Sequence, residues 1–184
     1  MLGSQGRGGS SPPFDTIKYN KIMKKILLFS SLSAIILGLL LVIGGIGGLV
    51  FTYKNVVREN ITTSKDANIA NVPVRGPFTI KAQADTIREH VLRITEGKTF
   101  SEMPQQIPKL DENNEPVLDK DDKNVMTENT TRNIWITATT LMTALNLGML
   151  AYAFFSLTLL FGLFSVWIGI IFFILSQKIV KSLF

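Results

Sequence analysis

The chain has 184 residues, carries no cysteine and contains a single histidine, His90. The absence of cysteine excludes disulfide bonds, thiolate metal sites and thiol nucleophiles, and a lone histidine removes most catalytic and transition-metal constellations. Only 18% of the residues are charged, against about 25% in an ordinary soluble protein, and the missing charges are concentrated in two segments.

Two long segments contain no Asp, Glu, Lys or Arg. The first, residues 26–53, has 28 residues, and the second, residues 133–177, has 45. A helix needs about 20 consecutive apolar residues to cross the hydrocarbon core of a bilayer. Both segments exceed this length, so the sequence predicts an integral membrane protein of the all-α membrane class.

The charges outside these segments predict an orientation. The parts of the chain before the first segment and after the second carry a net charge of +6, whereas residues 54–132 carry −1. Because Lys and Arg near span ends mark the cytoplasmic side, we expect both termini to be cytoplasmic and residues 54–132 to be extracytoplasmic. Basic ends attract anionic lipid head groups, so we expect membrane lipid, and not nucleic acid, as the partner of these charges.

The N-terminal region divides into a leader and a first span. Residues 1–22 begin with Gly, Ser and Pro, and Met23-Lys24-Lys25 directly precedes the apolar segment like a natural start. We therefore interpret residues 1–22 as a disordered leader or an over-extended start. Residues 23–53 are predicted to form an uncleaved signal-anchor helix, because a cleaved signal peptide has an apolar core of only about 7–15 residues.

Small residues in the first span predict a helix-contact face. Small side chains let helix backbones approach closely, and the Gly44-x-x-x-Gly48 spacing is the minimal form of this pattern. The alternative interpretation is that glycine is simply common in membrane helices. The residues predicted to form the contact are Ala34, Gly38, Gly44 and Gly48.

The extracytoplasmic segment contains one clear helical pattern, from Phe78 to Thr95. Its apolar positions recur at steps of four and three residues, and Gly97 follows as a stop signal. His90 lies off this apolar stripe and is expected to be a solvated surface residue. The predicted core of this small helical ectodomain is Ile80, Ala84, Ile87, Val91 and Ile94.

Residues 110–125 consist of two similar units, LDENNEPV and LDKDDKNV. A Leu-Asp pair before a polar turn and a Val after it predict two successive turns or a small hairpin. Ca²⁺ takes several carboxylate oxygens, but the glycine of an EF-hand loop is missing, so we interpret the carboxylates as solvated and predict no metal or other cofactor. The weak Ca²⁺ candidates are Asp111, Asp119, Asp121 and Asp122.

The second charge-free segment has two interpretations. As one helix it would be about 67 Å long, with residues 133–156 packed on the ectodomain, residues 157–177 crossing the membrane and residues 178–184 forming a cytoplasmic tail. A helical hairpin would instead give three spans. The long helix is favoured because no Pro, charge or polar cluster marks a turn, and because a hairpin would place the C-terminal lysines outside.

Three stretches resemble a group of small bacterial membrane proteins that are often named aromatic ring-opening dioxygenase: residues 71–79 (NVPVRGPFT), 82–85 (AQAD) and 97–100 (GKTF). The resemblance runs from about residue 26 to residue 177. It implies a span, a short extracytoplasmic segment and a C-terminal apolar helix in a bacterial plasma membrane. The acidic segment at 110–125 departs from the pattern of the group. Dioxygenase chemistry requires iron held by histidine and carboxylate ligands, and this chain with its one histidine does not supply a typical set.

The expected class of function is inferred from the motifs and charges that the sequence lacks. The sequence has no Gly-x-Ser-x-Gly or His-Glu-x-x-His motif, and neither apolar segment holds a charge that would mark a transport path. We therefore expect a structural or accessory membrane protein rather than an enzyme, which binds a membrane-protein partner or a second copy through its ectodomain and spans. The alternative is an extracytoplasmic sensor or a cation- or ligand-binding module, and a metal-dependent oxygenase ranks third.

Overall fold

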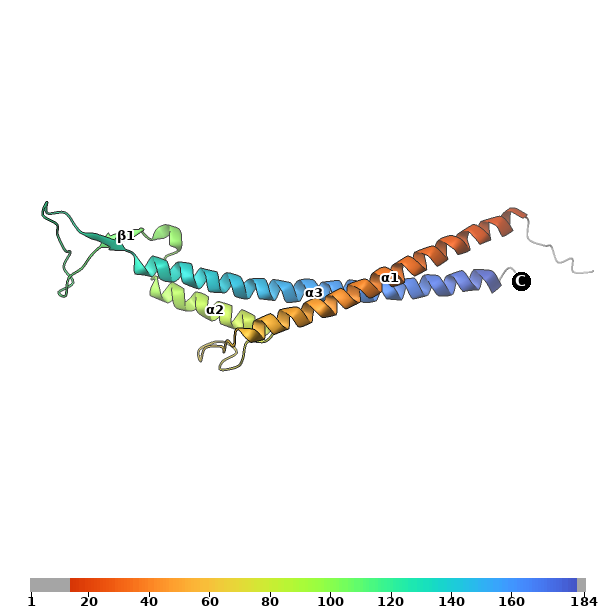
Figure 1. The fold of residues 1–184 in the computed structure, drawn as a ribbon, viewed down its shortest axis with the longest axis horizontal. Helices are drawn as coiled ribbons and strands as arrows, with labels where there is room; N and C mark the ends of the chain where they lie inside the picture. Colours follow the sequence, from red (N-terminus) through yellow and green to blue (C-terminus); the bar gives the residue numbers. More distant parts are fainter. Residues whose placement is uncertain (1–13, 182–184) are drawn as a thin grey trace, which may run out of the picture. The chain divides into compact units, whose positions relative to one another are not determined.

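The computed structural model describes residues 14–181, with side chains from residue 18 to residue 178. This part of the chain is mostly helical and contains one small two-stranded sheet (Figure 1). Its elements in chain order are α1 (Phe14–Arg58), α2 (Pro77–Ile94), the short 3-10 helix η1 (Phe100–Glu102), β1 (Gln106–Pro108), β2 (Met126–Glu128) and α3 (Thr130–Lys181).

Both long helices extend beyond the predicted spans. α1 begins at Phe14, so residues 14–22 are helical and not disordered. The alternative of an over-extended start stays a prediction, and residues 1–13 lie outside the described part. Residues 14–22 contain neither Gly nor Pro, the two residues that most disfavour a helix interior. At its other end α1 continues past Tyr53 to Arg58, and Asn60 then adopts a positive φ of 49°.

α3 is one continuous helix of 52 residues. The prediction of a single long helix is therefore confirmed, and the alternative of a helical hairpin is wrong. The reason is local, because no residue between Ala153 and Gly162 interrupts the helical hydrogen bonds of an uncharged, proline-free segment.

The chain divides into two compact units. Within the described residues, the first, called here the helix-pair unit, comprises residues 14–47 and 155–181, and the second, called the middle unit, comprises residues 48–154. α1 and α3 therefore each contribute one part to each unit.

In the helix-pair unit, α1 and α3 run antiparallel at close range. The Ser31 hydroxyl donates to the Gly169 carbonyl at 2.8 Å, and the Ser165 hydroxyl donates to the Ala34 carbonyl at 2.8 Å. Residue numbers along α3 decrease as those of their contact partners on α1 increase, so the two helices are antiparallel. The buried positions on the two helices are spaced seven residues apart and are all small: Ser31, Gly38 and Gly45 on α1, and Gly162, Gly169 and Ser176 on α3.

In the middle unit, α2 packs along the first part of α3. Val91 of α2 forms a buried cluster with Ala138 and Met142 of α3, and the partly buried Ile87 and Trp135 pack against it. These side chains are drawn together by the removal of apolar surface from water.

The predicted core stripe of α2 differs from the structure at its last position. Ile80 is fully buried, Ala84 and Val91 are buried, and Ile87 is half-buried. Ile94 is 53% exposed and lies outside the core. It is the last residue of α2, where the helix ends before the stripe can complete another turn.

The ends of α2 follow from local sequence. Pro77 occupies the first turn, where its missing N–H removes no helical hydrogen bond. At the other end, Gly97 donates its N–H to the Leu92 carbonyl at 2.7 Å and Glu96 donates to the Arg93 carbonyl at 3.4 Å. This is a Schellman-type end. Glu96 (φ 53°) as well as the predicted stop residue Gly97 (φ 80°) has a left-handed backbone.

The segment between η1 and α3 contains the two predicted turns inside a hairpin. β1 pairs antiparallel with β2, with Ile107 opposite Thr127. Between the strands, three backbone hydrogen bonds of 2.7–2.8 Å form a closed ring in which Lys109 donates to Val125, Val125 to Val117, and Val117 to Lys109. Each eight-residue unit is therefore a separate loop that leaves and returns to this ring.

Candidate functional site

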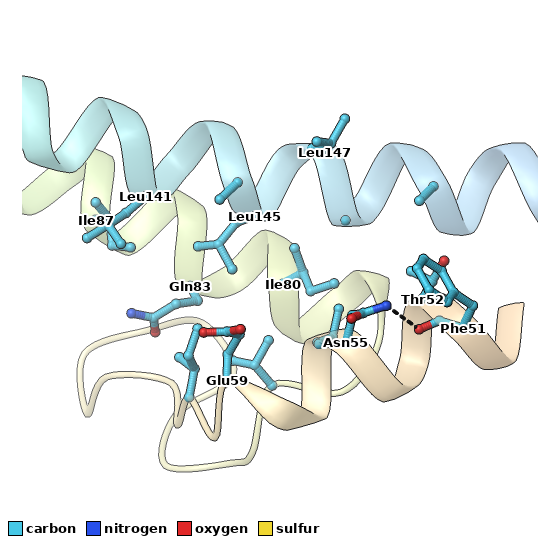
Figure 2. A pocket seen from close by; sticks show the side chains of 16 residues that line it. Phe51, Thr52, Asn55, Glu59, Ile80, Gln83, Ile87, Leu141, Leu145 and Leu147 are labelled. Atoms are coloured by element: carbon cyan, nitrogen blue, oxygen red, sulfur yellow. Dashed lines mark hydrogen bonds between the residues drawn. The ribbon is translucent and has the colours of Figure 1, made fainter. Parts of the chain in front are cut away.

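The middle unit contains an apolar groove with a volume of about 660 Å³ between the end of α1, the start of α2 and the centre of α3. This volume lies in the range of about 300–1,000 Å³ that is typical of small-molecule sites. Figure 2 shows aliphatic side chains such as Ile80 and Leu145 pointing toward the space above α1. The groove is lined by Phe51, Thr52, Asn55, Val56, Glu59, Ile61, Val74, Ile80, Gln83, Ile87, Leu141, Ala144, Leu145, Leu147, Gly148 and Ala151.

Three polar side chains, Asn55, Glu59 and Gln83, line the groove and differ in the polar group that each has available. The Asn55 amide donates to the Phe51 carbonyl at 2.9 Å, which leaves its oxygen as an acceptor. The Gln83 oxygen accepts the Ser64 N–H at 3.1 Å, which leaves its NH₂ group as a donor. The Glu59 carboxylate has no hydrogen-bond or ion-pair partner within the described part of the chain. The groove therefore combines apolar walls with an acceptor, a donor and one negative charge.

Two of these polar residues, Asn55 and Glu59, come after the charge-free segment of α1 in the chain. Phe51 and Thr52 belong to that segment, and Lys54 is the first charged residue after it. A methyl group built on Gly148 would lie 3.7 Å from the Val56 side chain and 3.7 Å from Ile80. Gly148 of α3 is thus level with the residues of α1 that directly follow Lys54.

Contacts outside the groove hold its walls in place. The Tyr152 hydroxyl of α3 donates to the Arg75 carbonyl, just before α2, at 2.8 Å. Thr79 bonds the Arg75 and Gly76 N–H groups at 3.0 and 3.2 Å. The loop before α2 is closed by backbone hydrogen bonds from Thr63 to Val72 (2.9 Å) and from Val74 to Ile61 (2.8 Å).

A second, shallower hollow of about 610 Å³ lies on another face of α3. We call it the threonine face; its residues are Phe100, Trp135, Ile136, Thr139, Thr140, Thr143, Ala144 and Leu147. Thr140 donates its hydroxyl to the Ile136 carbonyl at 2.9 Å, as threonines in a helix often do. Arg132 stacks over the Phe100 ring, 3.7 Å from its centroid, and so holds η1 against the start of α3. The face offers apolar and hydroxyl groups but no charge.

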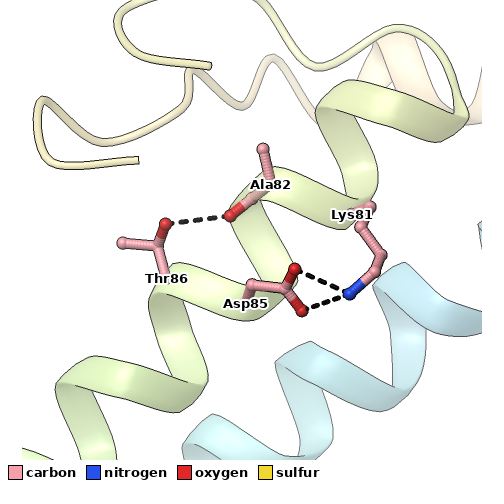
Figure 3. A network of polar contacts seen from close by, with 4 residues as sticks. All are labelled: Lys81, Ala82, Asp85 and Thr86. Carbon is pink, nitrogen blue, oxygen red and sulfur yellow. Dashed lines mark hydrogen bonds and ion pairs between the residues drawn. The ribbon is translucent and has the colours of Figure 1, made fainter. Parts of the chain in front are cut away.

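Two polar contacts stabilise the first half of α2. Lys81 bonds both carboxylate oxygens of Asp85 at 2.6 Å, one turn apart on an exposed face (Figure 3). The buried Thr86 donates its hydroxyl to the Ala82 carbonyl at 2.8 Å. Pairs of this spacing contribute about 0.2–0.5 kcal/mol to a helix, and these account for the charges of this part of α2.

His90 pairs with a residue that the sequence did not indicate. Its Nε2 lies 2.5 Å from a carboxylate oxygen of Asp66 in the preceding loop, and both side chains are largely exposed. This hydrogen bond, followed by one from the Asp66 backbone N–H and by the charges of His90 and Arg93, lowers the pKa of Asp66 below its ordinary value. The pair therefore links the loop to α2.

Glu102 has a similar structural role beside η1. The backbone N–H of Thr99 donates to its carboxylate at 2.6 Å and the Thr99 hydroxyl does so at 2.7 Å. These two bonds, with Lys98 nearby, lower the pKa of Glu102. The carboxylate caps the start of η1.

The acidic loops use their leading aspartates to close themselves. One oxygen of Asp111 accepts the N–H groups of Asn113 and Glu115 at 2.8 and 2.9 Å. Asp119 does the same for Asp121 and Lys123 at 2.8 and 3.0 Å. Asp122 lies at the left-handed corner of the second loop, with a φ of 54°. Among the described residues, no three His, Cys, Asp or Glu side chains gather as they would around a metal ion.

The predicted helix-contact residues occupy different surroundings. A Cβ on Gly38 would lie 2.7 Å from the Val166 backbone and 2.8 Å from the Gly162 carbonyl, and Ala34 accepts the Ser165 hydroxyl. Gly44 is exposed, with nothing within 4 Å of an added Cβ, and Gly48 belongs to the middle unit. Three further contact glycines were not predicted, namely Gly45, Gly162 and Gly169, whose added Cβ atoms would lie 2.6–2.8 Å from the opposite helix. The seven-residue spacing of Gly38 and Gly45 on α1, matched by Gly162 and Gly169 on α3, was the signal that could have predicted this contact.

Comparison with protein-family models, curated proteins and solved structures gives no match. The resemblance to the bacterial membrane-protein group therefore stays a prediction. By length and composition, two helices are able to cross a membrane, residues 18–58 of α1 and residues 130–178 of α3. The features that carry a functional argument are the apolar groove, the threonine face and the small-residue helix pair.

Proposed function

We propose that the protein is a two-span integral membrane protein, with both termini cytoplasmic and the middle unit extracytoplasmic, that acts by binding another membrane protein. In the most apolar 18-residue stretch of each long helix, only 11% is buried within the protein. A helix surface of this kind is stable where the surrounding solvent is itself apolar. Because α1 and α3 run antiparallel, Lys24 and Lys25 lie at the same end of the helix-pair unit as Lys178, as the positive-inside rule requires.

One observation carries the proposal of a binding function: α3 stays uncharged beyond the level at which α1 becomes charged. Gly148 is level with Val56, just after Lys54. Residues 133–147 of α3, which precede Gly148, lie farther along the middle unit than the charge-free part of α1. They nevertheless contain no Asp, Glu, Lys or Arg. This part of α3 therefore stands outside the membrane core without the charges that ordinarily cover a helix in water.

The threonine face is the part of this segment that α2 does not cover. Ile136 is 46% exposed and Leu147 is 63% exposed, whereas Ala138 and Met142 on the opposite face are buried against α2. An exposed apolar surface beside a membrane is characteristic of a protein contact. Since the face has hydroxyl groups but no charge, it suits an uncharged helix of another integral membrane protein, in which small or hydroxyl side chains allow close packing.

Site-specific photocrosslinking in cells tests this function. A benzophenone amino acid at Ile136, on the threonine face, is expected to give a discrete crosslinked protein band. The same amino acid at Arg88, on the exposed polar side of α2, is the matched control and is expected to give none. A crosslink at Ile136 to another membrane protein or to a second copy supports the proposal. Identical patterns at Ile136 and Arg88, or no protein crosslink at Ile136, would contradict it.

A further inference from the structure

We infer that the apolar groove of the middle unit holds one acyl chain of a membrane phospholipid whose head group carries a primary ammonium, such as phosphatidylethanolamine. The groove shares Ala144 and Leu147 with the threonine face, but its other lining residues differ. The inference rests on the membrane location proposed above. The groove has the volume of a ligand site and three helical walls, and lipid is the molecule that surrounds it in that location.

The polarity of the groove matches the orientation of a phospholipid in the bilayer. At one end lie Phe51 and Ala151, which belong to the uncharged parts of α1 and α3. At the other end lie Glu59, directly after the last residue of α1, and Gln83 of α2. Each is three residues farther along the chain than Val56 and Ile80, respectively, which meet beside Gly148. A lipid placed with its head group at Glu59 and its chain running toward Phe51 therefore points in the same direction as the neighbouring lipids.

The charges at the polar end favour a particular head group. The Glu59 carboxylate lacks a partner within the described residues, and an ammonium group can supply one. The free NH₂ group of Gln83 is a donor for a phosphate oxygen. The exposed Lys54 and Arg58 on the same part of α1 are further cations for the phosphate. An anionic head group without an ammonium would satisfy the donors but leave Glu59 unpaired.

The apolar walls explain why an acyl chain, and not water, fills the space. Phe51 is 66% exposed and Leu141 is 51% exposed, and the Thr52 hydroxyl and the Asn55 NH₂ group donate to backbone carbonyls at 2.9 Å. Water in a cavity requires two to four polar partners, whereas the end of the groove at Phe51 and Ala151 presents mainly hydrocarbon groups. A hydrocarbon chain requires none, and it removes the apolar walls from water.

Native mass spectrometry of the full-length protein tests the inference. The protein is extracted into mild detergent from membranes that contain equal amounts of phosphatidylethanolamine and phosphatidylglycerol. We expect one retained phospholipid per chain, enriched in phosphatidylethanolamine. Glu59→Gln is expected to keep the lipid but to reduce this enrichment about two- to fivefold, the range of an exposed ion pair. Glu89→Gln, on the exposed side of α2, is the matched control and should keep the enrichment.

A second pair of variants tests the groove itself. Gly148→Phe places a ring in the groove and is expected to abolish lipid retention, whereas Gly148→Ala adds a methyl group at ordinary contact distance, 3.7 Å from its neighbours, and should retain the lipid. Photoactivatable diazirine phosphatidylethanolamine provides a measurement on the unchanged protein, with crosslinks expected at Leu145 and Val56. These crosslinks keep the test decisive if Gly148→Phe does not fold.

The outcomes separate this inference from the proposed function. No retained phospholipid, equal retention by a folded Gly148→Phe variant, or unchanged head-group enrichment in Glu59→Gln would overturn the inference. Recovery of the unchanged chain in carbonate-washed membranes, together with any of these results, leaves the membrane location standing and rejects only the lipid site. Recovery in the soluble fraction would contradict the membrane location first.

Discussion

The helix-pair unit and the middle unit use the same two helices, α1 and α3, but bury opposite kinds of residue. In the helix-pair unit, the buried positions are glycine and serine, and the large apolar side chains point outward. In the middle unit, the buried positions include Ile80, Val91 and Met142. A helix that is apolar on all sides gains nothing from burying leucine when its surroundings are equally apolar, so backbone proximity and hydrogen bonds determine the contact.

The difference shows how a helix can change its packing chemistry along its length. In the middle unit, where charges return to the chain, apolar side chains gain free energy by leaving water, and α2 supplies the cover. In the helix-pair unit, the seven-residue spacing of small residues on both helices keeps one narrow face of each against the other.

The largest effect is expected in the hydrophobic core of the middle unit. Ile80→Ala removes a fully buried side chain and should lower the free energy of unfolding by about 2–5 kcal/mol. Ile94→Ala, in the same helix but 53% exposed, is the matched control and should change it by less than about 0.5 kcal/mol. Denaturant unfolding in detergent measures both. Equal losses would mean that the burial difference between the two isoleucines does not determine stability.

The second prediction concerns close packing in the helix-pair unit. Gly38→Leu forces atoms into a space where even a Cβ would lie 2.7 Å from the opposite backbone, and overpacking of this kind costs about 1–3 kcal/mol. Gly44→Leu, where the space is open, should have little effect. Because the chain has no cysteine, a disulfide between Ala34→Cys and Ser165→Cys reports on the pairing.

The disulfide yield distinguishes the two glycines. We expect efficient oxidation in the otherwise unchanged chain and in the Gly44→Leu background, and a clear loss in the Gly38→Leu background. An unchanged yield with Gly38→Leu would show that the two helices do not depend on close backbone approach.

Much of the architecture could be predicted from the sequence, and particular residues show why. The helix from Phe78 to Thr95 was predicted within one residue at each end, because Pro77 and Gly97 bracket a regular apolar stripe. The single long α3 was predicted because nothing between Ala153 and Gly162 breaks a helix. In both places, local signals alone determine the result.

The contact residues were harder to predict, because they depend on two segments that are far apart in the chain. Gly44-x-x-x-Gly48 is a local pattern, but the buried glycine is Gly45, which faces Leu159. Only the matching spacing of Gly162 and Gly169 on α3 selects the correct face of α1. The groove was missed for the same reason, since its walls come from three helices and the connection between α1 and α2.

A third, smaller effect is expected in the acidic loops. Asp111→Ala and Asp119→Ala each remove an acceptor of two backbone N–H groups, and each should destabilise its own loop by about 1 kcal/mol. Asp121→Ala removes a carboxylate without such bonds and serves as the control. Hydrogen exchange at the Glu115 and Lys123 amides measures the effect. Similar losses in the two loops would support their equivalence, and loss of both loops from either change would show that the backbone ring couples them.

The smallest effect concerns the Asp66–His90 pair and depends on pH. The pKa of Asp66 is lowered in the folded chain, first by the hydrogen bond with His90. The ionised carboxylate therefore stabilises the fold above its ordinary pKa of 3.8, and this contribution is lost as the pH falls through the lower folded-state value. Asp66→Asn should remove this acid-dependent part of the stability, measured by thermal unfolding from pH 6 to about pH 2. Identical pH profiles for the two proteins would contradict the role of the pair.

The most direct test of the account is the location of three positions relative to the membrane in intact cells. The cysteine-free chain allows single reporter thiols at Asn113 in the acidic loops, at Arg88 on α2 and at Ser182 near the C-terminus. With a membrane-impermeant maleimide, the account predicts labelling of the first two in intact cells and of Ser182→Cys only after permeabilisation. Labelling of Ser182→Cys in intact cells, or protection of Asn113→Cys and Arg88→Cys, would contradict two spans with an extracytoplasmic middle unit.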